Sequence, residues 1–164
     1  MKIETERLEI KLLTPEHLAL WLDDLPRLEQ EFTCRYRAEP LAGDFRTIVE
    51  IQRDATFADA ACPQWHSFWF LIRKTDRTVV GSAIFKDRPD PGGCVEIGYG
   101  LGRGFEHNGY MTEAVEALCT WALQQEGVRH ITAETDADGF ASQRILLKCG
   151  FREHSRAETC RWIR

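Results

Sequence analysis

The sequence predicts a mixed α/β fold in which a mostly antiparallel sheet carries helices. Three observations lead to this class. Three strand-like runs follow one another in the middle of the chain with only turns between them. Helical periodicities lie before and after this block. The chain has 164 residues, of which 43% are hydrophobic, the size and composition of one domain with its own core. We therefore expect residues 1–164 to form a single domain.

The N-terminal region is expected to begin with a strand and a helix. Residues 6–13 (ERLEIKLL) alternate charged and apolar side chains, which indicates a half-buried strand. Thr14 and Pro15 follow with the character of an N-cap and a first helical residue. Pro26 should limit the extension of this helix, because proline removes a backbone donor.

The next elements lead into the central block. Residues 33–43 have an irregular composition, and Asp44 is expected to cap a second helix that runs through Ile51 toward Phe57. Aromatic and β-branched residues then predict strands, and the polar segments between them predict turns. The expected strands are 66–73, 78–86 and 95–101, which should form an antiparallel meander.

After this block the apolar period changes from two residues to that of a helix. The expected elements are a helix over 111–125 ended by Gly127, a strand over 130–134, a helix over 141–148 with Gly150 as its C-cap, and one or two strands from Phe151 onward. The order β-α-α-β-β-β-α-β-α-β-β predicts a mixed sheet with an antiparallel front and a crossover behind it.

Composition excludes several classes of protein. Lys and Arg number 21 against 26 Asp and Glu, a formal charge of −5, so no basic surplus exists for a nucleic-acid partner. No apolar run approaches the ~20 residues of a membrane span, and residues 1–13 lack the pattern of a signal peptide. We expect a cytoplasmic protein with no nucleic-acid or membrane partner.

The cysteines and histidines suggest neither disulfides nor a metal site. The six cysteines include no Cys-x-x-Cys pair, and a chain of this size does not need disulfide staples. They are expected to be reduced and to fill the core as small hydrophobic side chains. The five histidines form no pair at metal-ligand spacing.

The most informative stretch is residues 98–111, GYGLGRGFEHNGYM, which leads from a strand into a helix. A helix N-terminus carries free N–H groups and partial positive charge, so such a turn suits a phosphate. The dinucleotide pattern of glycines at i, i+2 and i+5 is not met. Gly104 and Gly109 have the spacing of a Walker loop, but Tyr110 stands where that loop needs lysine. The stretch therefore fits neither nucleotide-binding loop.

The string EIGYGLGRGFEHNGYMTEAVEAL resembles the acyl-coenzyme A loop of the GNAT acetyltransferases, especially the branch of ribosomal-protein N-terminal acetyltransferases. Two further strings resemble the same branch, ETERLEIKLLTPEHL at the start and AETDADGFASQRILLKCGF near the end. The resemblance covers nearly the whole chain. This sequence departs from the family pattern at Glu106, where Gln or Arg is usual, at Met111, where Gly or Ala is common, and at Gly139, where Asn is common.

The resemblance implies a GNAT-like fold, a twisted sheet of about six to seven strands with about four helices and a bulged or splayed central strand. It implies acetyl-CoA as cofactor and an amine acceptor, either a protein N-terminus or a small molecule. The bulge is expected near residues 98–101, where it would position the pantetheine and offer an N–H to the developing oxyanion.

Site residues follow from the same resemblance. Glu96 lies on the central strand, where a Glu often removes the proton of the acceptor amine; the alternative is a solvent-facing carboxylate or a cross-strand partner of an arginine. The expected coenzyme-binding residues are Tyr99, Leu101, Arg103, His107, Asn108, Gly109, Tyr110, Met111, Thr112 and Ser142. Gly109 alternatively serves a tight turn only, Arg103 and His107 alternatively lie in solvent, and Ser142 alternatively caps a helix. Arg144 and Lys148 are expected to be solvated rather than bound to the ribose phosphate.

The proton donor to the leaving thiolate stays open. Many relatives use a tyrosine in the last helix, but Leu146 occupies that position here, so water is the default. Tyr99 and Tyr110 are alternatives, although packing is the simpler role for both. By resemblance, the acceptor site is expected to be walled by Trp21, Thr33, Arg35, Tyr36 and Arg37. Of the successive aromatics 68–70, at least one should face out of the core or line that site.

Two further expectations concern partners. The departure at Glu106 and the absent helical tyrosine favour a rival function, an acyl-CoA-binding sensor or interaction module with weak or no turnover. A homodimer is plausible if residues 160–163 form an exposed edge strand, since pairing across a two-fold axis would cover that edge.

Overall fold

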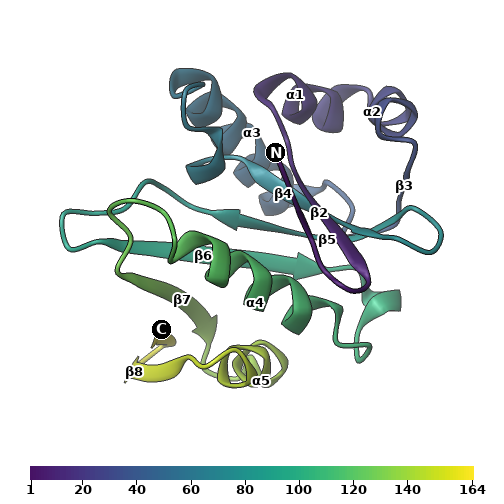
Figure 1. The fold of residues 1–164 in the computed structure, drawn as a ribbon. Helices are drawn as coiled ribbons and strands as arrows, with labels where there is room; N and C mark the ends of the chain where they lie inside the picture. Colours follow the sequence, from purple (N-terminus) through teal and green to yellow (C-terminus); the bar gives the residue numbers. More distant parts are fainter.

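Nine strands form one twisted sheet in the computed structural model, which describes all residues from Met1 to Arg164 (Figure 1). The strands are β1 (Lys2–Glu4), β2 (Leu8–Leu12), β3 (Arg35–Tyr36), β4 (Phe68–Arg73), β5 (Thr78–Phe85), β6 (Cys94–Leu101), β7 (His130–Asp136), β8 (Arg152–Arg156) and β9 (Thr159–Ile163). The helices are α1 (Pro15–Asp23), α2 (Leu25–Phe32), α3 (Gly43–Ala58), α4 (Tyr110–Ala122) and α5 (Phe140–Lys148). The sheet order is β1-β2-β4-β5-β6-β7-β9-β8, with β3 beside β5.

The first helix begins as the sequence predicts, but the segment after it differs. Thr14 accepts from the backbone of His17, and the His17 ring accepts from the Thr14 N–H, which closes a capping box around the start of α1. Pro26 does not merely end a helix; it stands in the first turn of a second one, α2, whose N-cap Asp24 accepts from the N–H of Arg27. Proline suits that place because the first helical N–H groups need no internal partner.

Two other short elements were not predicted, and one cap was placed wrongly. Residues 35–36 lie within the segment expected to be irregular, yet they form β3, which pairs parallel with the start of β5. Residues 2–4 form β1. The N-cap of α3 is Ala42 rather than Asp44, which lies in the first turn.

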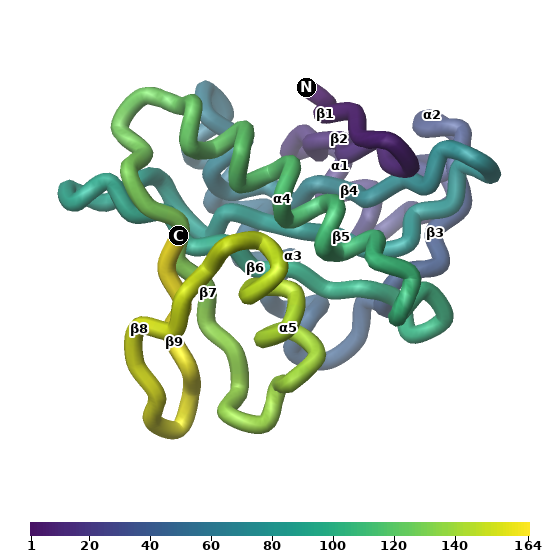
Figure 2. Tube along the Cα trace, turned by 60° about the horizontal axis from the view of Figure 1, so that its bottom comes forward, coloured from purple at the N-terminus to yellow at the C-terminus, as the bar shows by residue number.

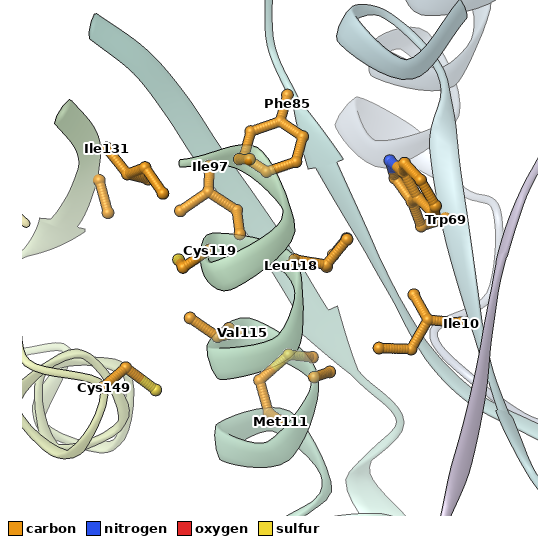
Figure 3. Packing of buried hydrophobic residues seen from close by; sticks show 14 of the residues in the cluster. Ile10, Trp69, Phe85, Ile97, Met111, Val115, Leu118, Cys119, Ile131 and Cys149 are labelled. Carbon is orange, nitrogen blue, oxygen red and sulfur yellow. The ribbon is translucent and has the colours of Figure 1, made fainter. Parts of the chain in front are cut away.

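Helices cover both faces of the central sheet. The α1–α3 group packs on one face with a core cluster that includes Trp21, Phe68 and Phe70, whereas α4 packs on the other with a cluster that includes Trp69 and Leu118 (Figure 3). Because neither face is open, all three successive aromatics 68–70 are buried. The expectation that one of them faces out of the core is therefore wrong.

The central strands β4, β5 and β6 form the predicted antiparallel meander. β6 then changes partner along its length. Its first part, Cys94–Glu96, pairs parallel with β7, and its second part, Ile97–Leu101, pairs with β5 only. The sheet consequently splays between β6 and β7, as expected for the central strand. Its pairing with β5 is in continuous register, and the register shift lies between β4 and β5 at Leu71/Ile72.

The C-terminal part carries α5 and the β8–β9 hairpin beside β7 (Figure 2). The helix α4 ends at Ala122, earlier than predicted, and Gly127 lies in the loop that follows. Gly150 has a φ of 79° directly after α5, as a C-terminal glycine should. β9 lies between β7 and β8, so residues 160–163 are not an edge strand; β1 and β8 are the outer strands. None of the five helices combines the length and the apolar character that crossing a membrane requires.

Candidate active site

A cleft of about 430 Å³ opens where the sheet splays, between the end of β6, the start of α4 and one side of α5. We call it the splay cleft. Its lining residues are Tyr99, Gly100, Leu101, Glu106, His107, Gly109, Tyr110, Met111, Thr112, Ala141, Ser142, Arg144, Ile145 and Lys148.

The loop before α4 forms one wall of this cleft with a row of free backbone donors. The N–H groups of residues 107–112 donate to no acceptor within the protein. His107 and Gly109 have φ of 63° and 79°, and Tyr110 begins the helix. Alternation into the left-handed region turns successive N–H groups toward one side, and the helix end adds partial positive charge. Residues 107–112 therefore form a cradle for an anion, here called the amide cradle.

Most of the side chains expected to bind the coenzyme line the splay cleft. Two do not. Arg103 lies in the short 3-10 helix before the loop and is exposed. Asn108 turns its side chain back, donating from Nδ2 to the carbonyl oxygens of Phe105 and Glu106. Its N–H remains part of the amide cradle.

The splay cleft also carries charged side chains. Arg144 and Lys148 are exposed, as expected, and both line the cleft from α5. Glu106 lines it as well, so the residue that departs from the family pattern stands inside the cleft. Two cations from α5 face one carboxylate, which leaves the side chains of the cleft favourable to an anion.

Tyr99 and Ser142 join the two sides of the splay. The Tyr99 hydroxyl lies 2.9 Å from Ser142 Oγ and also donates toward the Ser142 carbonyl at 3.3 Å. Burial raises the pKa of Tyr99 to about 12, so this phenol keeps its proton at neutral pH. Tyr110 is occupied differently: its ring lies under the Arg7 guanidinium, 4.6 Å from the ring centroid.

Glu96 lies outside the splay cleft, on the other face of β6. Val95 and Ile97 belong to the core cluster under α4, and alternation along a strand turns Glu96 to the α1–α3 face. Its carboxylate pairs with the Lys86 ammonium across the strands. The cross-strand partner is thus a lysine, where the sequence alternative named an arginine.

Two glycines of β6, Gly98 and Gly100, leave one face of this strand without side chains at their positions. A Cβ on Gly98 would lie 3.4 Å from Ile84 and 3.5 Å from Lys86, both on β5 or at its end. A Cβ on Gly100 would lie 3.1 Å from the Glu39 carboxylate. The α1–α3 side of β6 at Gly98 and Gly100, here called the acceptor face, therefore carries no side chain of its own and lies between Glu96 and Glu39.

Sequence reasoning missed Glu39, Arg7 and Glu113. Glu39 lies in a segment with no periodic signal. Glu113 falls opposite the apolar positions of the α4 period, yet its carboxylate is held by the β1–β2 turn. More than a hundred residues of sequence separate Glu113 from its partners Thr5 and Arg7, so no local sequence pattern predicts this contact. Of the expected acceptor wall, Trp21 and Tyr36 are core residues packed on each other, with ring centroids 5.7 Å apart.

No cysteine lines the splay cleft. All six are free, and four of them are buried: Cys34, Cys119, Cys149 and Cys160. Burial raises the pKa of Cys119 to about 12 and that of Cys149 to about 11, so neither is a thiolate at neutral pH. No three His, Cys, Asp or Glu side chains cluster as a metal site would require.

The pattern of the acetyltransferase (GNAT) domain family matches residues 7–152. The uncharacterized N-acetyltransferase YjdG of Bacillus subtilis (strain 168) is 38% identical over 96 residues, which are 58% of this chain and 57% of that protein. The chain thus aligns with little more than half of that relative. A second protein of the same organism, the uncharacterized N-acetyltransferase YoaA, is 26% identical over 155 residues, 92% of this chain and 82% of YoaA.

Solved structures share the fold. The ribosomal-protein-S5-alanine acetyltransferase from Vibrio fischeri superposes with a TM-score of 0.73 at 15% identity, covering 100% of this chain and 96% of that one. RimL, a ribosomal L7/L12 α-N-protein acetyltransferase solved with coenzyme A, gives 0.71 at 15% identity over 100% and 97% of the two chains. Such identities show the fold alone. Since the family pattern covers all but the two ends of the sequence, the chain belongs to the GNAT acetyltransferase family.

Proposed function

We propose that this protein is an acetyl-CoA-dependent N-acetyltransferase whose coenzyme lies in the splay cleft with its pyrophosphate on the amide cradle. One observation carries the proposal: the N–H groups of residues 107–112 have no acceptor in the protein, and all of these residues except Asn108 line the cleft. A diphosphate supplies the anionic oxygens that such a row of donors binds. Arg144 and Lys148 add positive charge, which offsets Glu106. RimL, which shares the fold, was solved with coenzyme A.

The splay itself suits the pantetheine arm. Residues 97–101 of β6 pair with β5 on one side, and β7 pairs only with residues 94–96. Backbone groups of the second half of β6 that face β7 therefore have no strand partner. An N–H there would stabilise negative charge that develops on the thioester oxygen. Acetyl-CoA, when bound, supplies the thioester carbonyl that the amine attacks.

In this proposal the amine reaches the thioester from the acceptor face, over Gly98 and Gly100. An ammonium must lose a proton first, because a lysine side chain titrates near ~10.4 and an α-amino group near ~7.7–8.0. The Glu96 carboxylate, directly or through a water, accepts that proton. Its ion pair with Lys86 holds the carboxylate on the acceptor face. An incoming ammonium would compete with Lys86 for the same carboxylate.

The leaving thiolate needs a proton, and water or Tyr99 supplies it. Tyr99 lines the cleft and keeps its phenolic proton because of burial. Leu146, at the position where many relatives have tyrosine, is fully buried and has no proton to give.

The acceptor is a peptide or small-molecule amine. Glu96 and Glu39 flank the acceptor face from two sides, which suits a cationic group. The unpaired cysteines suit the reducing cytoplasm, where we place the protein. The rival function, a coenzyme-binding module without turnover, draws on Glu106, whose carboxylate stands in the cleft.

One experiment separates the two functions. Thiol release from acetyl-CoA is measured with a panel of amines and N-terminal peptides, together with calorimetric titration of coenzyme A. We expect turnover on at least one acceptor and a fall of about 10²-fold or more in kcat for Glu96→Gln. Glu134→Gln, which alters an exposed carboxylate on the neighbouring strand β7, is the matched control and should leave kcat unchanged. Coenzyme binding without turnover on any acceptor would establish the sensor instead.

A further inference from the structure

An ionic cluster adjoins the amide cradle, and none of its residues lines the splay cleft. It joins the β1–β2 turn to the first turn of α4, two segments that lie side by side although about a hundred residues separate them (Figure 2). Glu113 Oε1 accepts from the Arg7 N–H at 2.8 Å and from the Thr5 hydroxyl at 2.6 Å. Glu113 Oε2 accepts from Arg7 Nε at 2.7 Å.

The same guanidinium also holds the cradle. Arg7 Nη1 donates to the carbonyl oxygen of Asn108 at 2.8 Å. All peptide bonds are trans, and in a trans peptide the C=O and the following N–H point in opposite directions. With its carbonyl fixed on Arg7, the Asn108–Gly109 peptide must aim the Gly109 N–H away from Arg7. Stacking of Arg7 on the Tyr110 ring fixes the next residue as well.

Glu113 keeps Arg7 in this orientation. Its side chain is only 18% exposed. Burial by itself would raise the pKa of Glu113, but hydrogen bonds from Thr5 and Arg7 outweigh burial and lower the pKa. The carboxylate therefore stays ionised, and Arg7 cannot rotate away without leaving it unpaired in a half-buried place.

We propose that Arg7 and Glu113 are positioning residues for the coenzyme: they orient the amide cradle without touching the ligand. The inference rests on the proposed function for the identity of that ligand. Positioning and long-range electrostatics predict opposite changes in coenzyme affinity when the charge of Glu113 is removed. Removing the negative charge of Glu113 leaves Arg7 uncompensated beside an anion site, so long-range electrostatics alone would tighten coenzyme binding. Loss of positioning would weaken it.

The test compares Glu113→Gln with a matched pair on the same helix. Glu116 forms a two-bond ion pair with Arg164, at 2.7 and 2.9 Å, away from the cradle, so Glu116→Gln removes a similar charge and pair. We expect the Kd of coenzyme A, measured by calorimetry, to rise about tenfold or more for Glu113→Gln. It should stay within about twofold for Glu116→Gln. Arg7→Lys keeps the charge but cannot bond Glu113 and Asn108 together, and should weaken binding in the same direction.

A second readout does not need the ligand. In the free protein, NMR order parameters of the N–H groups of residues 107–112 should fall from the ~0.85 of rigid backbone toward ~0.6 in Glu113→Gln, and not in Glu116→Gln. Unchanged or tighter binding by Glu113→Gln, with unchanged order parameters, would overturn the positioning role. If the wild-type protein binds no coenzyme A, the proposed function fails, and the order parameters still decide whether Glu113 holds the cradle. Should Glu113→Gln fail to fold, Arg7→Lys gives both readouts.

Discussion

Gly109 allows the backbone conformation of the amide cradle. Its φ of 79° belongs to the left-handed region, and its peptide precedes the first turn of α4. A Cβ there would lie 3.4 Å from the Arg7 guanidinium, the group that fixes the Asn108 carbonyl. That distance is an ordinary contact, so the need for glycine here comes from the positive φ. His107 has a φ of 63° without being glycine, so the loop holds one strained residue two positions earlier.

Gly109→Ala is predicted to weaken coenzyme binding and lower stability together. Alanine at positive φ costs about 1–2 kcal/mol, and relief of that strain would rotate the N–H groups out of line. We expect a stability loss of about 1 kcal/mol in urea unfolding and a rise of about tenfold in the calorimetric Kd of coenzyme A.

Gly104→Ala is the control, because a Cβ at Gly104 meets nothing within 4 Å and its φ is not positive. It should change neither quantity by more than the error of measurement. A Gly109→Ala protein that binds coenzyme A as tightly as the wild type would show that the loop conformation does not matter for binding.

At the scale of single residues, the sequence predicts the turn before α4 but not the contact of Glu113 with the β1–β2 turn. The glycine and the start of the helix are local signals that predict a turn suited to a phosphate, whereas the assignment of Gly109 and Tyr110 to the coenzyme comes from the family resemblance. Glu113 follows the helical period of a solvent-facing residue, and its burial depends on the β1–β2 turn that packs over it. A local pattern does not contain that contact.

Among the elements, β5 and β6 come close together at the end of β6, next to the splay cleft. Gly81 lies opposite Leu101 at the last paired position of β6. A Cβ on Gly81 would lie 2.6 Å from the carbonyl oxygen of Gly100 and 3.3 Å from the Leu101 Cα. Both neighbours are backbone atoms, which cannot rotate aside. The close approach of the two strands, immediately beside the acceptor face, thus depends on glycine at this position.

Gly81→Ala should therefore destabilise the protein by about 1–3 kcal/mol, the usual cost of forcing extra volume into a packed core. Chemical unfolding measures it. Gly98→Ala, also on this strand pair, meets only ordinary contacts at 3.4 and 3.5 Å and should cost much less. Equal losses for the two variants would mean that the backbone approach at Gly81 is not tight.

The elements that the sequence does not predict are short or carry proline in the first turn. β3 is two residues long, too short for any period, and it exists because the edge of β5 is available beside it. α2 was missed because Pro26 was interpreted as a stop, whereas proline in a first turn costs nothing. The longer elements, such as β5 and α4, have a clear hydrophobic period, and their predicted ends agree with the structure to within a few residues.

On the scale of the whole molecule, different helices pack on the two faces of the central sheet. The α1–α3 group covers one face and α4 covers the other (Figure 1), and the splay cleft is lined by the end of β6, the start of α4 and α5. The opening between them exists because β6 changes partner from β7 to β5 along its length. In our proposal the coenzyme and the amine approach β6 from these two sides.

This arrangement follows only partly from the sequence. The order of elements and the antiparallel meander are predictable from periodicity. The place of β9 inside the sheet rather than at its edge is not predictable from periodicity. It depends on pairing between strands that are far apart in the chain. The position of Glu96 on the face opposite the cleft does follow from strand alternation, once the buried faces of Val95 and Ile97 are known.

The most direct test of the account is a titration of ¹⁵N-labelled wild-type protein with acetyl-CoA, followed through the backbone amide resonances. The N–H groups of residues 107–112, which have no acceptor in the protein, should shift most, because they gain phosphate oxygens as acceptors. Amide shifts confined to other regions of the chain, with residues 107–112 unchanged at saturating acetyl-CoA, would contradict the account.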